Sequence, residues 1–152
     1  MFRKIILIAL VVFIAIQFIQ PSRNTSDKIL ATDITKVYSV PDSVHALLTT
    51  ACYDCHSNNT IYPWYVHIQP VAWFMASHIT DGKADLNFSE FGAYSLRKQQ
   101  HKLQSIADEI NHGDMPIASY KLMHGNARLN EHQKATLVDW ATRTKDSIII
   151  KN

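Results

Sequence analysis

The sequence lacks several features that mark common ligand-binding folds. Only four of its 152 residues are glycine, and none of them belongs to a glycine-rich loop of the kind that binds phosphate groups. The net charge is only +2, and no stripe of basic residues with interleaved aromatic residues occurs. The sequence therefore gives no indication of nucleic-acid binding. Internal repeats and low-complexity segments are also missing, so we expect one small domain.

Cysteine is scarce as well, and the two cysteines present stand close together. They form the motif Cys52-Tyr53-Asp54-Cys55-His56, whose C-x-x-C-H spacing is typical of a c-type haem attachment site. Two thiols three residues apart lie on one face of a helical turn, where both can form thioethers with the vinyl groups of one haem. The next side chain, an imidazole, can bind the iron. We predict one covalent haem c attached through Cys52 and Cys55, with His56 as the proximal ligand.

Three other uses of a cysteine pair fit the sequence less well. A thioredoxin-like redox pair follows a strand within a βαβ pattern, whereas the motif here is preceded by a helical pattern and followed by a polar loop. A structural zinc site needs two further ligands at regular spacing, and the remaining histidines are scattered. A disulfide between Cys52 and Cys55 would close a small, strained ring. Zinc binding and dithiol chemistry remain as alternatives to haem.

The N-terminus has the pattern of an export signal. Arg3 and Lys4 precede an apolar run from Ile5 to Ile19 that is interrupted only by Gln17. No small-residue cleavage site follows the run, so we expect an uncleaved signal anchor, a transmembrane helix over residues 1–20. The basic residues then stay in the cytoplasm, and the rest of the chain faces the periplasm or another extracytoplasmic space. Bacteria attach haem covalently on that side of the membrane.

Three further segments follow the predicted anchor. Residues 21–36 are polar and show no apolar period, so we expect a flexible tether from the membrane. The haem-binding domain is predicted over 37–145 and a short C-terminal tail over 146–152. A domain of about 110 residues has room for one modest core, and a haem inside that core would add buried apolar area.

Only helical patterns recur within residues 37–145, so the predicted fold is all-α, a small cytochrome c-like domain around one haem. Ser95 is the expected N-cap of the longest helix and Gly113 its end, and Asn130 with Gln133 forms a capping box for the last helix. A third helix is predicted to run from Pro70 to Asp81-Gly82, with Val71, Phe74, Met75, His78 and Ile79 on its apolar face. The residues expected to face inward on the longest and last helices are Leu103, Ile106, Ala107, Ile110, Leu137, Trp140 and Ala141.

The sixth position on the haem iron has three candidate occupants. Met115 stands directly before Pro116 in a loop between two predicted helices, where a thioether sulfur can lie over the open haem face. We predict Met115 as the distal ligand, and treat Met75 and Met123 as ordinary packing residues. His78 is the alternative ligand, and an open or water-bound iron is the third possibility.

These motifs in combination resemble those of the bacterial haem-binding domain family of cytochrome c-like proteins. The resemblance spans residues 40–142 and implies covalent haem at Cys52 and Cys55, His56 as the proximal ligand, and Met115 in the place of the cytochrome c distal methionine. The chain departs from mitochondrial-type cytochromes in one respect. There the first and last helices cross through a glycine and an aromatic residue, and no glycine precedes Cys52 here. The motifs that carry the resemblance are Cys52 to Thr60, Tyr62 to Tyr65, Pro70 to Trp73, His78, Leu86 to Glu90, Gly113 to Pro116 and Leu137 to Trp140.

Two classes of function are consistent with this site. If His56 and Met115 fill both axial positions, the protein binds no substrate at the iron and is a one-electron carrier rather than an enzyme. A membrane anchor would keep such a carrier near its redox partner proteins. If the distal ligand is labile or absent, the alternative is a haem-based ligand sensor or a small peroxidase-like enzyme.

Overall fold

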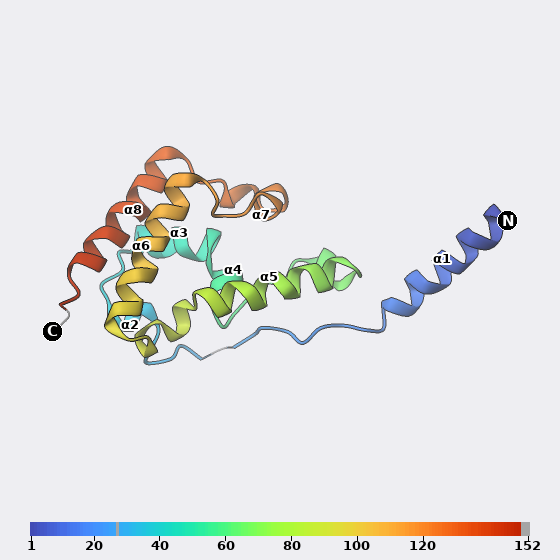
Figure 1. The fold of residues 1–152 in the computed structure, drawn as a ribbon, viewed down its shortest axis with the longest axis horizontal. Helices are drawn as coiled ribbons and strands as arrows, with labels where there is room; N and C mark the ends of the chain where they lie inside the picture. Colours follow the sequence, from blue (N-terminus) through green and yellow to red (C-terminus); the bar gives the residue numbers. More distant parts are fainter. Residues whose placement is uncertain (27, 150–152) are drawn as a thin grey trace.

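The computed structural model describes residues 1–26 and 28–149, and every regular element in these residues is helical, which confirms the all-α prediction. The chain folds around two long helices, α6 and α8, which lie side by side, while α5 extends from them toward the N-terminal helix (Figure 1). The elements in chain order are α1 (Phe2–Ile16), α2 (Ile34–Val37), α3 (Asp42–Ala51), α4 (Tyr53–His56), η1 (Trp64–His67), α5 (Val71–Asp85), η2 (Phe88–Ala93), α6 (Leu96–His112), α7 (Ala118–Met123), η3 (Gly125–Ala127) and α8 (Glu131–Asp146).

The main hydrophobic core lies where α3, η2, α6 and α8 meet. Leu48 of α3, Leu103 of α6 and Leu137 of α8 are fully buried there, together with Phe88 and Phe91 of η2. All seven residues predicted to face inward on the longest and last helices are buried. The helical periodicity therefore identified the correct faces of α6 and α8.

The predicted ends of these two helices are also confirmed. The Ser95 hydroxyl accepts a hydrogen bond from the Lys98 amide at 3.3 Å, which caps the start of α6. Gly113 ends the helix with φ at +81°, a left-handed conformation that glycine adopts without a steric penalty. At the start of α8, Asn130 and Gln133 exchange two hydrogen bonds of 2.9 Å and form the predicted capping box.

Helix α5 differs from its prediction in both length and orientation. It continues past Gly82 to Asp85, and of the five residues expected on its buried face only Ile79 is buried, whereas Val71 and Phe74 are exposed. The reason is that only the C-terminal half of α5 reaches α4 and the core. Its first turns extend away from α6 and α8 (Figure 1), and there Ala72 is buried while Val71, Trp73 and Phe74 stay exposed.

The N-terminal helix α1 contains 15 residues, fewer than the transmembrane helix predicted over residues 1–20. Within residues 1–26 and 28–149, none of the helices combines the length and the apolar character required to span a bilayer, so that prediction is not confirmed. Directly after the helix, the Gln17 side chain accepts a hydrogen bond of 2.9 Å from the Gln69 backbone amide.

The segment predicted as a flexible tether, residues 21–36, instead packs on the domain. The Asn24 side chain donates to the Ser57 carbonyl oxygen at 2.9 Å and accepts from Lys83 Nζ at 2.6 Å, and Ile34 is fully buried. The folded unit therefore begins before Val37. Of the predicted tail, residues 146–149 continue from α8 and residues 150–152 lie outside the described part.

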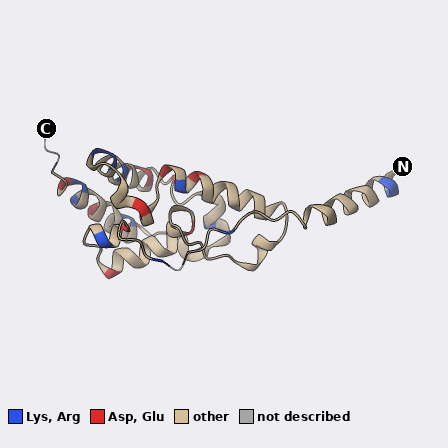
Figure 2. Cartoon of the chain, turned by 90° about the horizontal axis from the view of Figure 1, so that it is seen from below, with Lys and Arg blue, Asp and Glu red and all other residues tan. Residues whose placement is uncertain are grey.

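Charged residues are unevenly distributed over the molecule. Lysine, arginine, aspartate and glutamate concentrate on the half that contains α6 and α8, while the end that holds α1 and the start of α5 carries few of them (Figure 2). The two halves therefore present different surfaces to their surroundings.

Candidate haem site

The Cys-x-x-Cys-His motif occupies the short helix α4 and the residue before it. Helix α3 leads directly into the motif, because the Cys52 amide still donates to the Leu48 carbonyl at 2.9 Å. The His56 amide then donates to the Cys52 carbonyl at 3.0 Å, which closes one helical turn. The two thiols are free, and the turn gathers both of them and the imidazole at one place, as the spacing predicts.

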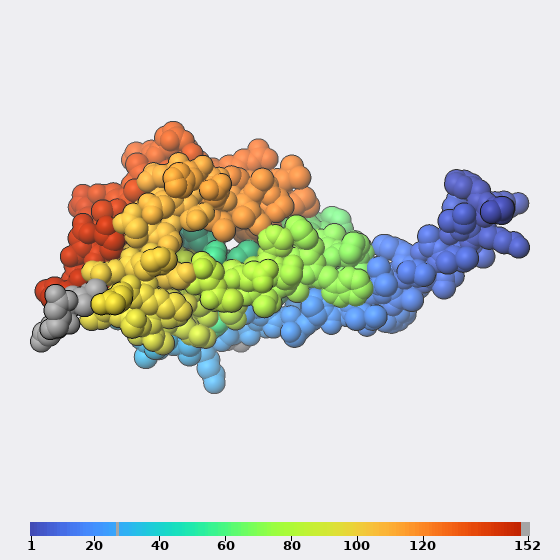
Figure 3. Space-filling view, viewed as in Figure 1, coloured from blue at the N-terminus to red at the C-terminus, as the bar shows by residue number. Residues whose placement is uncertain are grey.

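A crevice runs along this turn. It consists of two cavities of about 330 and 240 Å³, and both are lined by Cys52, His56 and Met115. The surface is visibly hollowed between α5 and the segment that holds the end of α6 and α7 (Figure 3). The larger cavity has a mainly hydrophobic wall, as expected for a cofactor site. The apolar residues of that wall are Leu86, Phe88, Ile106, Ile110 and Leu129.

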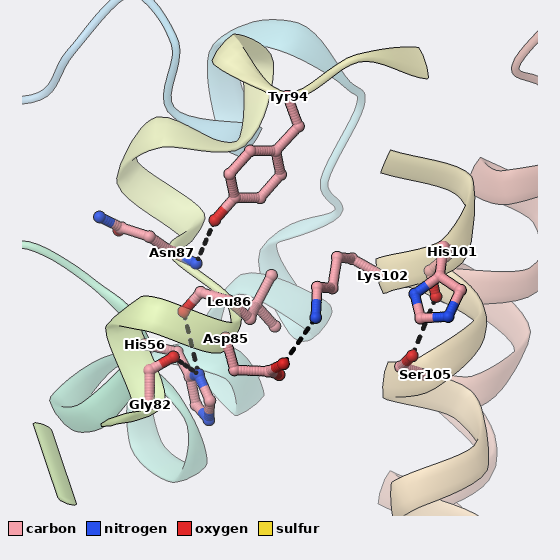
Figure 4. Close-up of polar contacts among 9 residues, drawn as sticks. All are labelled: His56, Gly82, Asp85, Leu86, Asn87, Tyr94, His101, Lys102 and Ser105. Carbon is pink, nitrogen blue, oxygen red and sulfur yellow. Dashed lines mark hydrogen bonds and ion pairs between the residues drawn. The ribbon is translucent and has the colours of Figure 1, made fainter. Parts of the chain in front are cut away.

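His56 is held by the backbone of the region where α5 ends. Its Nδ1 atom lies 2.9 Å from the Gly82 carbonyl oxygen and 3.0 Å from the Leu86 carbonyl oxygen (Figure 4). Carbonyl oxygens only accept hydrogen bonds, so Nδ1 carries the proton and donates it. This arrangement leaves Nε2 as the ring nitrogen available to bind a metal.

Gly82 lets α5 approach the motif closely. A Cβ atom at this position would lie 2.8 Å from the Cys55 carbonyl oxygen and 3.2 Å from Cys55 Cβ, too close for any other residue without a backbone shift. The sequence pattern predicted only a helix end at Gly82, so this contact was not predicted. A glycine inside an otherwise helical pattern was the available signal.

The thiols are not activated for disulfide exchange. Burial raises the pKa of Cys52 to about 12, with a smaller contribution from Cys55, and burial together with the Asp54 charge raises the pKa of Cys55 to about 11. Dithiol catalysts need an accessible thiolate of low pKa. Protonated, partly buried thiols at the floor of an apolar crevice fit thioether formation with a bound haem better than redox exchange.

Met115 is the predicted distal ligand, and it lines both cavities of the crevice. It lies in the loop between α6 and α7 and is 39% exposed. The alternative ligand, His78, lines only the smaller cavity, and its Nδ1 is 2.8 Å from the Phe74 carbonyl oxygen. Neither Met75 nor Met123 is among the residues that line these two cavities.

Two charged groups from different helices meet at the wall of the larger cavity. Lys102 of α6 forms an ion pair of 2.6 Å with Asp85 of α5, and His101 lines the same cavity (Figure 4). A haem carries two carboxylate groups. Besides His56, the basic side chains that line this cavity are Lys102 and His101.

Asp54, inside the motif, forms a buried polar contact that was not predicted from the sequence. Asp54 accepts hydrogen bonds from the Tyr120 hydroxyl at 2.8 Å and from the Ile61 amide at 2.9 Å. Burial and this hydrogen bond both raise the pKa of Tyr120. Because Tyr120 belongs to α7, the contact ties the motif helix to the segment that follows Met115. The two residues are 66 positions apart, which is why spacing alone gave no signal.

The arrangement of donor atoms suits a haem better than a bare metal ion. Across residues 1–26 and 28–149, no group of three or more histidine, cysteine, aspartate or glutamate side chains is close enough together to hold a metal ion. A haem iron takes most of its ligands from the porphyrin and needs only axial groups from the protein. One fixed histidine in an apolar crevice with two thiols meets that need.

Comparison with known proteins agrees with this interpretation. Residues 11–143 match the family model described as a haem-binding domain, and the matched range includes residues 21–36, which pack on the motif. The comparisons with curated proteins and with solved structures gave no match. The family match covers most of the chain, and the chain therefore belongs to the haem-binding domain family.

Proposed function

We propose that the protein is a monohaem c-type cytochrome that carries single electrons outside the cytoplasm. The observation that carries this proposal is the pair of side chains in the crevice. His56 is fixed with its Nε2 free, and Met115 lines both cavities that His56 lines. With one ligand from each of these residues, both axial positions are filled and no substrate reaches the iron.

Each residue of the site has a defined part in this function. Cys52 and Cys55 hold the cofactor by thioethers, so it is not lost when the oxidation state changes. The carbonyl groups of Gly82 and Leu86 keep the His56 ring in one orientation and one tautomer. When bound, the haem supplies the one-electron change, and the rigid packing around His56 limits the structural change that accompanies it.

The extracytoplasmic location is part of the proposal. Arg3 and Lys4 followed by the apolar residues of α1 form the pattern of an export signal. Covalent attachment through a C-x-x-C-H motif takes place after export in bacteria, so the N-terminus and the motif agree. The protein should acquire haem only in a host with a c-type maturation system and an intact N-terminal segment.

Extraction of the haem tests covalent attachment. The full chain, produced in a host with c-type maturation, is treated with acidified organic solvent. We expect the haem to stay on the polypeptide, and each single variant, Cys52→Ala or Cys55→Ala, to keep one thioether and a shifted absorption band. A double Cys52→Ala/Cys55→Ala variant is the control and should release all haem. Free haem from the unmodified protein would contradict the proposal.

The second candidate function, ligand sensing or peroxidase-like chemistry, has one observation in its favour. Met115 is partly exposed in a loop, and His78 lines the cavity beside it. A displaceable methionine with a nearby histidine is what a ligand-binding haem requires. Carbon monoxide distinguishes the two functions: the ferrous electron carrier should resist it, and rapid binding by the unmodified protein would favour the sensor or enzyme.

A further inference from the structure

Two long segments of the chain are free of formal charge. Residues 5–22 and residues 61–80 contain no lysine, arginine, aspartate or glutamate. The first segment covers most of α1, and the second covers η1 and the first part of α5. The structure brings both segments to the same end of the molecule, away from the charged helices α6 and α8 (Figures 1 and 2).

This end exposes large apolar side chains. Trp64 is 75% exposed and Phe74 is 52% exposed, and Ile61, Ile68 and Trp73 are exposed beside them. We call these five residues the aromatic end. None of the five lines either cavity of the haem crevice, so a haem in the crevice does not cover them. Apolar patches of this kind on a soluble surface mark a binding site.

The residues that follow α1 are hydrogen-bonded to the segment between η1 and α5. The fully buried Gln69 donates from its backbone amide to Gln17 Oε1 at 2.9 Å and from its side chain to the Ile19 carbonyl at 2.7 Å. Gln69 and Pro70 precede α5, and the neighbouring Ile68 belongs to the aromatic end. No residue of α1 itself is buried. The apolar helix and the aromatic end therefore lie at the same end of the molecule, and Arg23 is a charged side chain beside them, 4.4 Å from the Tyr62 ring centroid.

We propose that α1 and the aromatic end together bind a phospholipid surface, with Trp64 and Trp73 at the level of the headgroups. A helix that is apolar on all sides needs an apolar environment on all sides, which a lipid layer provides and a single protein groove does not. Tryptophan is enriched at the boundary between lipid and water. Protein interfaces usually have a polar or charged rim, whereas neither segment contains a charged residue. Among the described residues, the exposed charged side chain in contact with the second segment is Arg23, at His67 and Tyr62.

The proposal concerns where the domain binds and holds whether or not the haem carries electrons. It also orients the crevice. Gly82, which contacts the motif, lies about 12 Å along α5 from Phe74 at about 1.5 Å per residue. The haem site is therefore held above the lipid surface, on the side that faces other proteins at the membrane.

Vesicle binding by the full, haem-loaded chain tests the proposal. The probe is a vesicle of phosphatidylcholine with a minor share of phosphatidylglycerol, and binding is measured by flotation. The double variant Trp64→Ser/Phe74→Ser should bind about tenfold more weakly, because two large apolar side chains no longer leave water. The double variant Leu122→Ser/Ile149→Ser is the matched control, because Leu122 on α7 and Ile149 after α8 are exposed away from the aromatic end. Its binding should stay within about twofold of the unmodified protein.

Hydrogen exchange on the unmodified protein provides a readout that does not depend on the variants. With vesicles present, amides of α1 and of residues 61–76 should exchange more slowly, while those of α7 and α8 should not change. Protection of α1 alone would overturn the proposal, and so would equal binding by the two double variants. If the chain instead self-associates without lipid and Trp64→Ser/Phe74→Ser abolishes this, the surface binds a second copy and the lipid assignment is wrong.

Discussion

The two sides of the haem crevice are built in different ways. On the His56 side, the imidazole is fixed by hydrogen bonds, the ring of Phe88 is fully buried, and Gly82 leaves no room for a Cβ atom beside Cys55. On the Met115 side, the ligand lies in a loop and is 39% exposed, and its backbone amide is held by one hydrogen bond of 3.3 Å to the Glu109 carbonyl. The His56 side is therefore fixed by packing and hydrogen bonds, whereas the Met115 side is a partly exposed loop.

The difference indicates how this fold divides its tasks. A helix of four residues such as α4 cannot be stable alone, so the motif depends on α3, α5 and η2 for its geometry. The geometry of the motif does not depend on the Met115 loop in the same way. We therefore expect changes on the His56 side to affect stability and haem attachment, and changes on the Met115 side to affect iron ligation with little cost in stability.

The largest effect is expected for the reactivity of the thiols in the folded, haem-free chain. At pH 8, Cys52 should react with iodoacetamide about a thousandfold more slowly than in the unfolded chain, and Cys55 about a hundredfold, because raised pKa values leave fewer thiolates. The rates should rise with pH until about 12 and 11, respectively. Equal rates in the folded and unfolded chain would show that the His56 side is open rather than closed.

Replacement of Gly82 should have the next largest effect. In Gly82→Ala the new methyl group meets the Cys55 backbone at 2.8 Å, so α4 and α5 must separate and the hydrogen bonds of His56 weaken. We expect a loss of about 3 kcal/mol in the free energy of unfolding and a lower yield of haem-loaded protein. Gly125→Ala is the matched control, because a Cβ there meets nothing within 4 Å. Denaturant titration measures both, and equal stability of the two variants would contradict the close helix crossing.

A smaller loss is expected when the contact between the two sides is cut. Tyr120→Phe removes the hydroxyl that donates to buried Asp54, at a cost of about 1–3 kcal/mol in the free energy of unfolding. Tyr53→Phe is the control, because the buried Tyr53 hydroxyl has no hydrogen-bond partner among the described residues. Its removal should leave stability unchanged or increase it. A larger loss of stability in Tyr53→Phe than in Tyr120→Phe would contradict this prediction.

The smallest change in stability is expected for Met115. Because the side chain is partly exposed, Met115→Ala should cost less than about 1 kcal/mol in the free energy of unfolding of the haem-free chain. The same variant should shift the ferric haem toward high spin, lower the reduction potential and allow carbon monoxide to bind the ferrous form. Met123→Ala should change none of these spectra. If His78→Ala alters the spectrum and Met115→Ala does not, His78 is the distal ligand.

Structural features formed by residues within one helical turn of each other were predictable from the sequence. The caps at Ser95 and at Asn130 with Gln133, and the helix end at Gly113, are local arrangements that depend on side chains one turn apart. The motif around Cys52 is local in the same sense. These parts of the fold and site appear in the structure where the sequence analysis placed them.

Features that depend on contacts between distant segments were not predictable. The imidazole of His56 and the carbonyl of Gly82 are 26 positions apart, and only the folded chain shows that they meet. The polar residues near Asn24 have the composition of a tether, yet they bond to the loop after the motif. The exposed Phe74 follows helical periodicity but has no core beneath it. The periodicity of apolar residues identifies the apolar face of a helix. Whether other parts of the chain cover that face depends on tertiary packing.

The position of His56 at the end of α5 has an electrostatic consequence. The carbonyl end of a helix carries about half a unit of negative charge, and the imidazole lies against it through Gly82, whose carbonyl also accepts from Leu86 at 2.8 Å. A negative potential beside the proximal ligand favours the ferric iron, which has one more positive charge. In the proposed ligation, the methionine sulfur raises the reduction potential and the macrodipole of α5 lowers it. The potential at which the protein exchanges an electron is then the balance of two opposing contributions.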